Sequence, residues 1–127
     1  MRPSLANGPI TFEVPGRPVP KARPRLDPRS GRFYTPTKTQ QYERLVAHCA
    51  WAAGVRLKSG MRVRVSLHAF LGRRPHPDPD NLLKAVVDGI QRANPEWNDR
   101  DAIKQKVEVH DAVANQQFAR ITVEVLP

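Results

Sequence analysis

Residues 76–95 read HPDPDNLLKAVVDGIQRANP, and this stretch predicts the best-defined helix of the chain. Pro79 suits the first helical position, because its missing N–H would have no partner there, and Asp78 then becomes the N-cap. Asn94-Pro95 ends the helix. At about 100° per residue, the apolar side chains share one arc that must face the core. They are Leu82, Leu83, Val86, Val87 and Ile90.

Strand patterns lie on both sides of this helix. Apolar and polar residues alternate over 61–70 and, more briefly, over 10–14, which predicts two strands with one buried face each. Two further strands are expected after the helix, over 107–113 and 118–126. We expect these last two to form a hairpin around Asn115-Gln116.

A second helix is expected over 37–53, where apolar residues recur at helical spacing. Thr37 or Thr39 can cap it, and Gly54 is a plausible stop. The predicted order is β-α-β-α-β-β. It indicates an α+β fold in which a mixed or antiparallel sheet of about four strands carries two helices on one face.

The composition limits the classes of function. A chain of 127 residues is the size of one domain, so 1–127 is expected to fold as a single unit. The 21 Lys and Arg against 12 Asp and Glu give a net charge of +9, which favours a nucleic-acid partner. No apolar stretch reaches the ~18 residues that a membrane span needs, and the start lacks the apolar segment of a signal peptide. The lone Cys49 is typical of a reducing compartment, so a cytoplasmic location is expected.

Carboxylates gather where the loop 76–78 enters the first helix. Asp80, Lys84 and Asp88 recur every four residues along one edge of that helix, beside Asp78 at its cap. Two or three carboxylates and an ammonium can therefore face a single point. Mg²⁺ takes such oxygen ligands, and a bound Mg²⁺ activates water and polarises a phosphate in phosphodiester cleavage. Lys84 could neutralise charge on the phosphate oxygens.

The same residues also have an ordinary structural interpretation. Asp before Pro is a common helix start, and Asp80 to Lys84 is a common i,i+4 ion pair. A site is favoured because Asp78 and Asp80 repel each other, a cost that a cation relieves. Arg73 and Arg74 lie just upstream, where they could hold phosphates.

A third carboxylate could come from the loop 97–101. If this loop returned to the start of the helix, Asp99 or Asp101 would complete the site; a solvated turn is the plain alternative. Of the 4 histidines, only His76 is near the acidic cluster, as a possible phosphate contact, and none has zinc-ligand spacing.

The segment 15–36 is basic and contains six prolines, which exclude a regular helix or central strand. Lys21, Arg23 and Arg25 occupy every second position, so an extended backbone would point them in one direction. With no acidic residue before Asp27 in this segment, we expect these cations to contact a phosphate backbone rather than merely solvate a loop. Phe33 is expected in the core.

These residues together resemble the RusA family of Holliday-junction resolvases. The resemblance covers most of the chain, and the Asp-x-Asp-Asn-x-x-Lys motif is its specific part. The matches, in order, are Val14-Pro15-Gly16-Arg17-Pro18 through Lys21-Ala22-Arg23-Pro24-Arg25, then Asp78-Pro79-Asp80-Asn81-Leu82 with Lys84 and Asp88, then Asp99 in the loop 97–103. The resemblance implies a homodimeric, Mg²⁺-dependent endonuclease (Mn²⁺ could substitute) that nicks two opposed strands of a four-way DNA junction.

The resemblance also implies site residues. Asp78, Asp80 and Lys84 match family residues needed for cleavage, the two carboxylates as metal ligands. The family's downstream Asp belongs to an adjacent pair, three and four positions before an apolar residue. Counting back from Ile103, this chain has Arg100 and Asp99 there, with Asp101 one position later. We favour Asp99 as the last catalytic and metal-binding residue, and Asp101 stays open. The residues expected to bind DNA are Arg17, Lys21, Arg23, Arg25, Arg73, Arg74, His76 and Asn81.

Two other hypotheses remain beside a junction resolvase. The first is a nucleic-acid-binding module without catalysis, in which Asp78 only caps a helix. The second is a nuclease of the same chemistry that prefers flaps or forks. Symmetry favours the resolvase, because a C₂ dimer offers two identical sites to a junction that is itself approximately two-fold.

Overall fold

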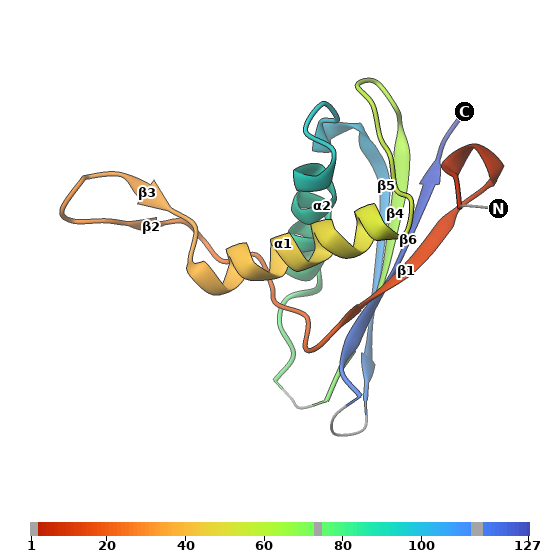
Figure 1. Cartoon of the computed structure of the whole chain (residues 1–127). Helices are drawn as coiled ribbons and strands as arrows, with labels where there is room; N and C mark the ends of the chain where they lie inside the picture. Colours follow the sequence, from red (N-terminus) through yellow and green to blue (C-terminus); the bar gives the residue numbers. More distant parts are fainter. Residues whose placement is uncertain (1–2, 73–74, 113–115) are drawn as a thin grey trace.

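The computed structural model describes residues 3–72, 75–112 and 116–127. One four-stranded sheet has the order β1-β6-β4-β5, with both helices on one of its faces (Figure 1). The predicted α+β fold is confirmed. The bounds of these elements are β1 Ile10–Pro15, α1 Thr37–Ala52, β4 Val63–Leu71, α2 Pro79–Ala93, β5 Ala102–Asp111 and β6 Phe118–Val125.

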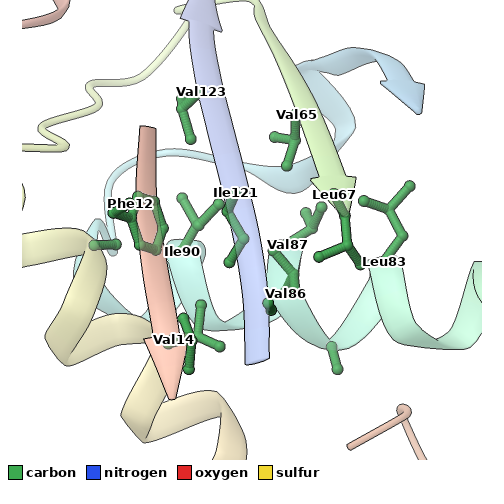
Figure 2. Close-up of a cluster of buried hydrophobic side chains, with 14 of the residues drawn as sticks. Phe12, Val14, Val65, Leu67, Leu83, Val86, Val87, Ile90, Ile121 and Val123 are labelled. Atoms are coloured by element: carbon green, nitrogen blue, oxygen red, sulfur yellow. The ribbon is translucent and has the colours of Figure 1, made fainter. Parts of the chain in front are cut away.

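Helix α2 has the predicted bounds. Asp78 is its N-cap, and one carboxylate oxygen accepts a hydrogen bond from the N–H of Asp80 at 2.8 Å. The predicted apolar arc is buried, and it packs on the sheet against residues such as Val65, Leu67 and Ile121 (Figure 2). The hydrophobic period of this one segment therefore positions it on the sheet.

The pairing of the last strands differs from the expected hairpin. Strand β4 lies between β5 and β6, and it pairs parallel with β5 and antiparallel with β6. Strand β5 also begins at Ala102, well before the expected 107. The turn expected at 115–116 lies partly outside the described residues. The first half of β5 contains Lys104, Gln105 and Lys106, which interrupt the apolar pattern that predicted a strand only from 107. Lysine is frequent on edge strands, where its charge discourages pairing with other chains.

Helix α1 begins one residue after Pro36, which is its N-cap and makes no side-chain capping bond. The expected cap at Thr37 or Thr39 is therefore wrong, and Thr39 is instead buried. The predicted stop is confirmed, since Gly54 adopts a φ of 97°, a left-handed conformation that favours glycine. No helix in the described part of the chain is long and apolar enough to cross a bilayer.

The two helices meet at Gly89 of α2. A Cβ atom placed there would lie 2.6 Å from Cβ of Val46 and 2.9 Å from the carbonyl oxygen of Glu43 on α1. Both distances are far inside van der Waals contact. Only glycine lets the helices approach this closely.

We therefore expect Gly89→Ala to lower the free energy of unfolding by about 1–2 kcal/mol. Alanine raises helix propensity by ~1 kcal/mol, but overpacking a close contact costs ~1–3 kcal/mol or more. Urea denaturation followed by circular dichroism measures the change. Lys38→Ala, at an exposed position of α1, is the control and should stay within ~0.5 kcal/mol. An unchanged or higher stability of Gly89→Ala would contradict the close helix contact.

Candidate functional site

The first turn of α2 presents the acidic cluster to solvent. Asp78, Asp80, Asn81 and Lys84 are all exposed. One oxygen of Asp78 is engaged by the N–H of Asp80, and no ion pair within the described residues engages either carboxylate. The unbonded N–H groups of a helix N-terminus favour negative charge there. The cluster is thus held in place and open to a cation.

Lys84 lies one turn after Asp80. The ordinary i,i+4 ion pair between them is not formed, and Lys84 has no ion pair with any residue that the structure describes. The Lys84 side chain is exposed, and it lies on the same face of α2 as the side chain of Asp80. Lys84 is therefore available to an anion that approaches the acidic cluster.

The loop 97–101 lies at the opposite end of strands β4 and β5 from the start of α2. Strands β4 and β5 are parallel, so α2 must run back from the end of β4 to the start of β5. The start of α2 lies near the ends of β4 and β5. Nε2 of His76, three residues before α2, is 3.3 Å from a carboxylate oxygen of Asp111, the last residue of β5. Asp99, in a short 3₁₀ turn, instead precedes Ala102, which pairs with Val63 at the start of β4.

The 15 residues of α2 separate these two places by about 20 Å at ~1.5 Å per residue. The expectation that the loop brings Asp99 or Asp101 back to the start of α2 is therefore wrong within one chain. The choice between Asp99 and Asp101 stays open. Asp99 is exposed and Asp101 half-buried, and neither lies near Asp78.

One group of side chains is close enough to hold a metal within a single chain, as far as the described residues go. His68, Glu108 and His110 have ligand atoms within 4.8 Å of one another, and Nδ1 of His68 lies 2.9 Å from Nε2 of His110. They face away from the helices, because the alternate residues Leu67 and Ala69 of β4 are buried. Sequence spacing could not reveal this group, because it forms by pairing of β4 with β5.

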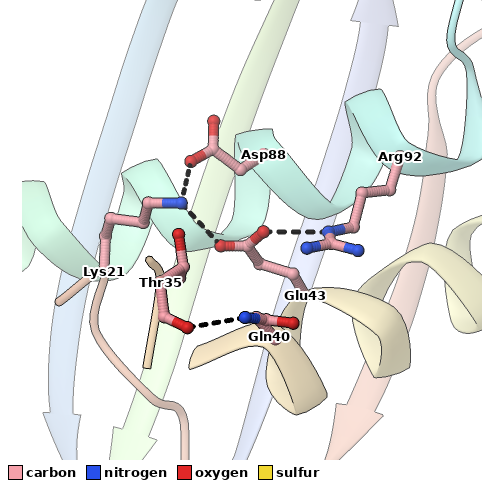
Figure 3. Close-up of polar contacts among 6 residues, drawn as sticks. All are labelled: Lys21, Thr35, Gln40, Glu43, Asp88 and Arg92. Carbon is pink, nitrogen blue, oxygen red and sulfur yellow. Dashed lines mark hydrogen bonds and ion pairs between the residues drawn. The ribbon is translucent and has the colours of Figure 1, made fainter. Parts of the chain in front are cut away.

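Lys21 is held by acidic residues of both helices (Figure 3). Its Nζ lies 2.8 Å from an oxygen of Glu43 on α1 and 3.0 Å from an oxygen of Asp88 on α2. The other oxygen of Glu43 accepts from Nε of Arg92 at 2.9 Å. The expectation that the basic segment has no acidic partner is therefore wrong at Lys21. Its partners are distant in sequence, which is why the segment alone did not show them.

The backbone of Lys21 also bonds to the acidic motif, since its N–H donates to the carbonyl oxygen of Asn81 at 2.8 Å. Burial lowers the pKa of the Lys21 ammonium, but the hydrogen bonds and charges of Glu43 and Asp88 raise it, and the net pKa is above its ordinary value. Lys21 thus stays charged and fastens the basic segment to α2, one turn beyond Lys84.

The remaining predicted site residues have mixed outcomes. Arg17, Arg23 and Arg25 are exposed, as phosphate contacts must be. Arg73 and Arg74 lie outside the described residues. Phe33 is 72% exposed, so its expected burial in the core is wrong.

Breaking the Lys21 network should destabilise the fold. Lys21→Met leaves Glu43, whose side chain is only 4% exposed, with Arg92 as its remaining cation. We expect a loss of about 2 kcal/mol in the free energy of unfolding, less than for a fully buried pair because the Lys21 side chain is 20% exposed.

Urea denaturation measures this loss, with Arg23→Met two residues later as the exposed control. Adding Glu43→Gln to Lys21→Met should recover part of the stability, because the partner charge is then gone. Equal stability of Lys21→Met and Arg23→Met would contradict the fastening role.

The comparison with known families covers all of these residues. The model of the family Endodeoxyribonuclease RusA matches residues 15–126, which run from the basic segment through the acidic motif to β6. No curated protein matches the sequence significantly. Since the family match spans most of the chain, the chain belongs to the RusA endodeoxyribonuclease family.

Proposed function

We propose that the chain is a magnesium-dependent endonuclease that resolves four-way DNA junctions by paired, symmetric nicks. The observation that carries this proposal is the open acidic turn of α2, where Asp78 and Asp80 are exposed and Lys84 projects one turn further on. A helix cap needs one of these carboxylates. It does not need the second, nor the lysine.

The donor set suits Mg²⁺ or Mn²⁺. Asp78 and Asp80 offer only oxygen, and Mg²⁺ commonly binds one or two protein carboxylates together with water and substrate phosphate. Bound there, the ion would supply Lewis-acid polarisation of the scissile phosphate and a lower pKa for the attacking water. The imidazoles of His68 and His110 suit softer transition metals instead, and they lie on the other face of the sheet.

Lys84 acts on the substrate in this proposal. Its ammonium lies on the same helix face as Asp80 and has no described intramolecular partner, so it can approach the phosphate that the acidic turn receives. A cation at this place stabilises the negative charge that develops on the phosphate oxygens during cleavage.

The third carboxylate comes from a second copy of the chain. Asp99 lies a helix length from Asp78 in its own chain, so the two cannot bind one ion. In a C₂ dimer, a contact from residue i to residue j is repeated from j to i. A second copy's Asp99, or its Asp101, can therefore complete the site twice, and the two sites are then related by the two-fold axis that opposed nicks require.

The exposed arginines of the basic segment bind the DNA backbone. Arg17, Arg23 and Arg25 neutralise phosphates, so affinity should fall steeply with salt. Lys21 contributes by holding this segment beside the acidic turn, through its bonds to Asn81, Glu43 and Asp88.

We expect Asp80→Asn to lower the rate of nicking in Mg²⁺ by about 10²-fold or more and to leave junction binding intact. The substitution removes the charge of a metal ligand and does not change the basic surface. Gel-shift and strand-cleavage assays on a labelled four-way junction measure the two quantities. Glu96→Gln, an exposed acid outside the site, is the matched control.

Unchanged nicking by Asp80→Asn would contradict the site. A panel of junction, flap, fork and duplex substrates separates the remaining alternatives. Faster cleavage of flaps or forks than of junctions would show that these structures, and not the junction, are the preferred substrate. Binding without cleavage of any substrate by the unmodified protein would favour a non-catalytic module.

A further inference from the structure

A two-stranded ribbon projects from the body of the protein (Figure 1). It consists of β2, Arg25–Leu26, and β3, Phe33–Tyr34, joined by a turn. Leu26 is 55% exposed, Phe33 72% and Tyr34 48%. Globular proteins rarely leave several large apolar side chains together in solvent unless they bind something there.

Trp51 is the remaining exposed large apolar side chain among the described residues, and it differs from the ribbon. The guanidinium carbon of Arg56 lies 3.2 Å from the centre of its ring, so the Trp51 face is covered within the chain. No such ring contact covers Phe33 or Tyr34 in the described part of the structure.

Hydrogen bonds of Asp27 fix the conformation of the turn that joins β2 and β3. Its carboxylate accepts from the N–H of Arg29 at 2.9 Å and from the hydroxyl of Ser30 at 3.1 Å. Its backbone N–H donates to the carbonyl oxygen of Arg32 at 2.8 Å, and its carbonyl oxygen accepts from the N–H of Gly31 at 2.8 Å. The exposed side chains are thus held in a defined arrangement, which lowers the entropy lost on binding.

The two faces of the ribbon differ. Leu26 pairs with Phe33 across the strands, and Arg25 pairs with Tyr34, so alternation puts the two pairs on opposite faces. One face is apolar and aromatic. Arg23, Arg29 and Arg32 are also exposed around the ribbon, and its one acidic residue, Asp27, is used by the turn.

The ribbon is anchored beside the acidic turn of α2. Before it, Lys21 is bonded to Asn81, and after it, the carbonyl oxygen of Thr35 accepts from the side chain of Gln40 at 2.6 Å (Figure 3). Leu26 follows Lys21 by five steps along the chain, a reach of at most about 18 Å. At ~3.4 Å per nucleotide along a strand, that reach corresponds to about five nucleotides.

We propose that this ribbon is a stacking element for the branch point of the DNA. Phe33 and Leu26 pack on a base pair that the branch leaves without a stacked neighbour, and the surrounding arginines bind the adjacent phosphates. This inference rests on the proposed function, since the reach just given starts at Lys21, whose N–H bonds to Asn81 in the acidic turn. A second copy of the chain is the poorer occupant of the same face, because its ribbon would carry the same arginines.

The test compares junction with duplex binding for ring variants. We expect Phe33→Ala, in an Asp80→Asn background that prevents cleavage, to weaken binding to a four-way junction by about fivefold or more and to leave binding to duplex of the same sequence nearly unchanged. Phe33→Trp should restore junction binding, and Phe33→Leu should restore it only partly. Trp51→Ala, at the other end of α1, is the control and should bind junction normally.

A 2-aminopurine base at the branch point gives a second readout. Its fluorescence should be quenched by the unmodified ribbon, because an aromatic ring stacks on it, and should stay high with Phe33→Ala. The proposal would be overturned if Phe33→Ala lost affinity for junction and duplex equally. It would also be overturned if the Phe33→Ala dimer dissociated in analytical ultracentrifugation. These binding readouts do not depend on nicking, so failure of the nuclease function would be seen separately.

Discussion

The structure depends on the parallel pairing of β4 with β5, which makes α2 a crossover helix. The chain must return along the sheet between two parallel strands, and the apolar arc of α2 covers the sheet as it does so. The same constraint sets the positions of the chemistry. Asp78 and Asp80 lie beyond one end of the parallel strands and Asp99 at the other end. A site that needs all three carboxylates must therefore take them from two chains.

The ion-pair network of Lys21 connects the basic segment 15–36 with the acidic turn of α2. Glu43 on α1 and Asp88 on α2 hold one lysine between them, and the backbone of that lysine bonds to Asn81 in the acidic motif. The basic segment is thus not a free arm beside the site. Lys21 fixes the position at which the chain leaves α2 toward the exposed arginines and the β2–β3 ribbon. In the proposed function, a phosphate bound by these arginines therefore lies at a limited distance from the acidic turn.

The sequence predicted what local signals determine. The bounds of α2, its cap at Asp78 and its buried face were all correct, because Pro79, the apolar period and Asn94-Pro95 lie within one segment. Apart from the cap of α1, which is Pro36 and not Thr37 or Thr39, the main errors concern long-range contacts. The parallel partner of β5, the acidic partners of Lys21 and the separation of Asp99 from Asp78 depend on which strands are neighbours. Phe33 was expected in the core because it is apolar, but it belongs to a ribbon too small to have one.

A mixed-dimer experiment tests the shared site most directly. Asp80→Asn is combined with whichever of Asp99→Asn and Asp101→Asn is inactive by itself, and subunits are exchanged so that about half of the dimers are mixed. In a mixed dimer, a shared site pairs the intact Asp80 of one subunit with the intact downstream Asp of the other. The account predicts that nicking of one junction strand returns on mixing. Two inactive variants that stay inactive together, although they exchange subunits, would contradict it.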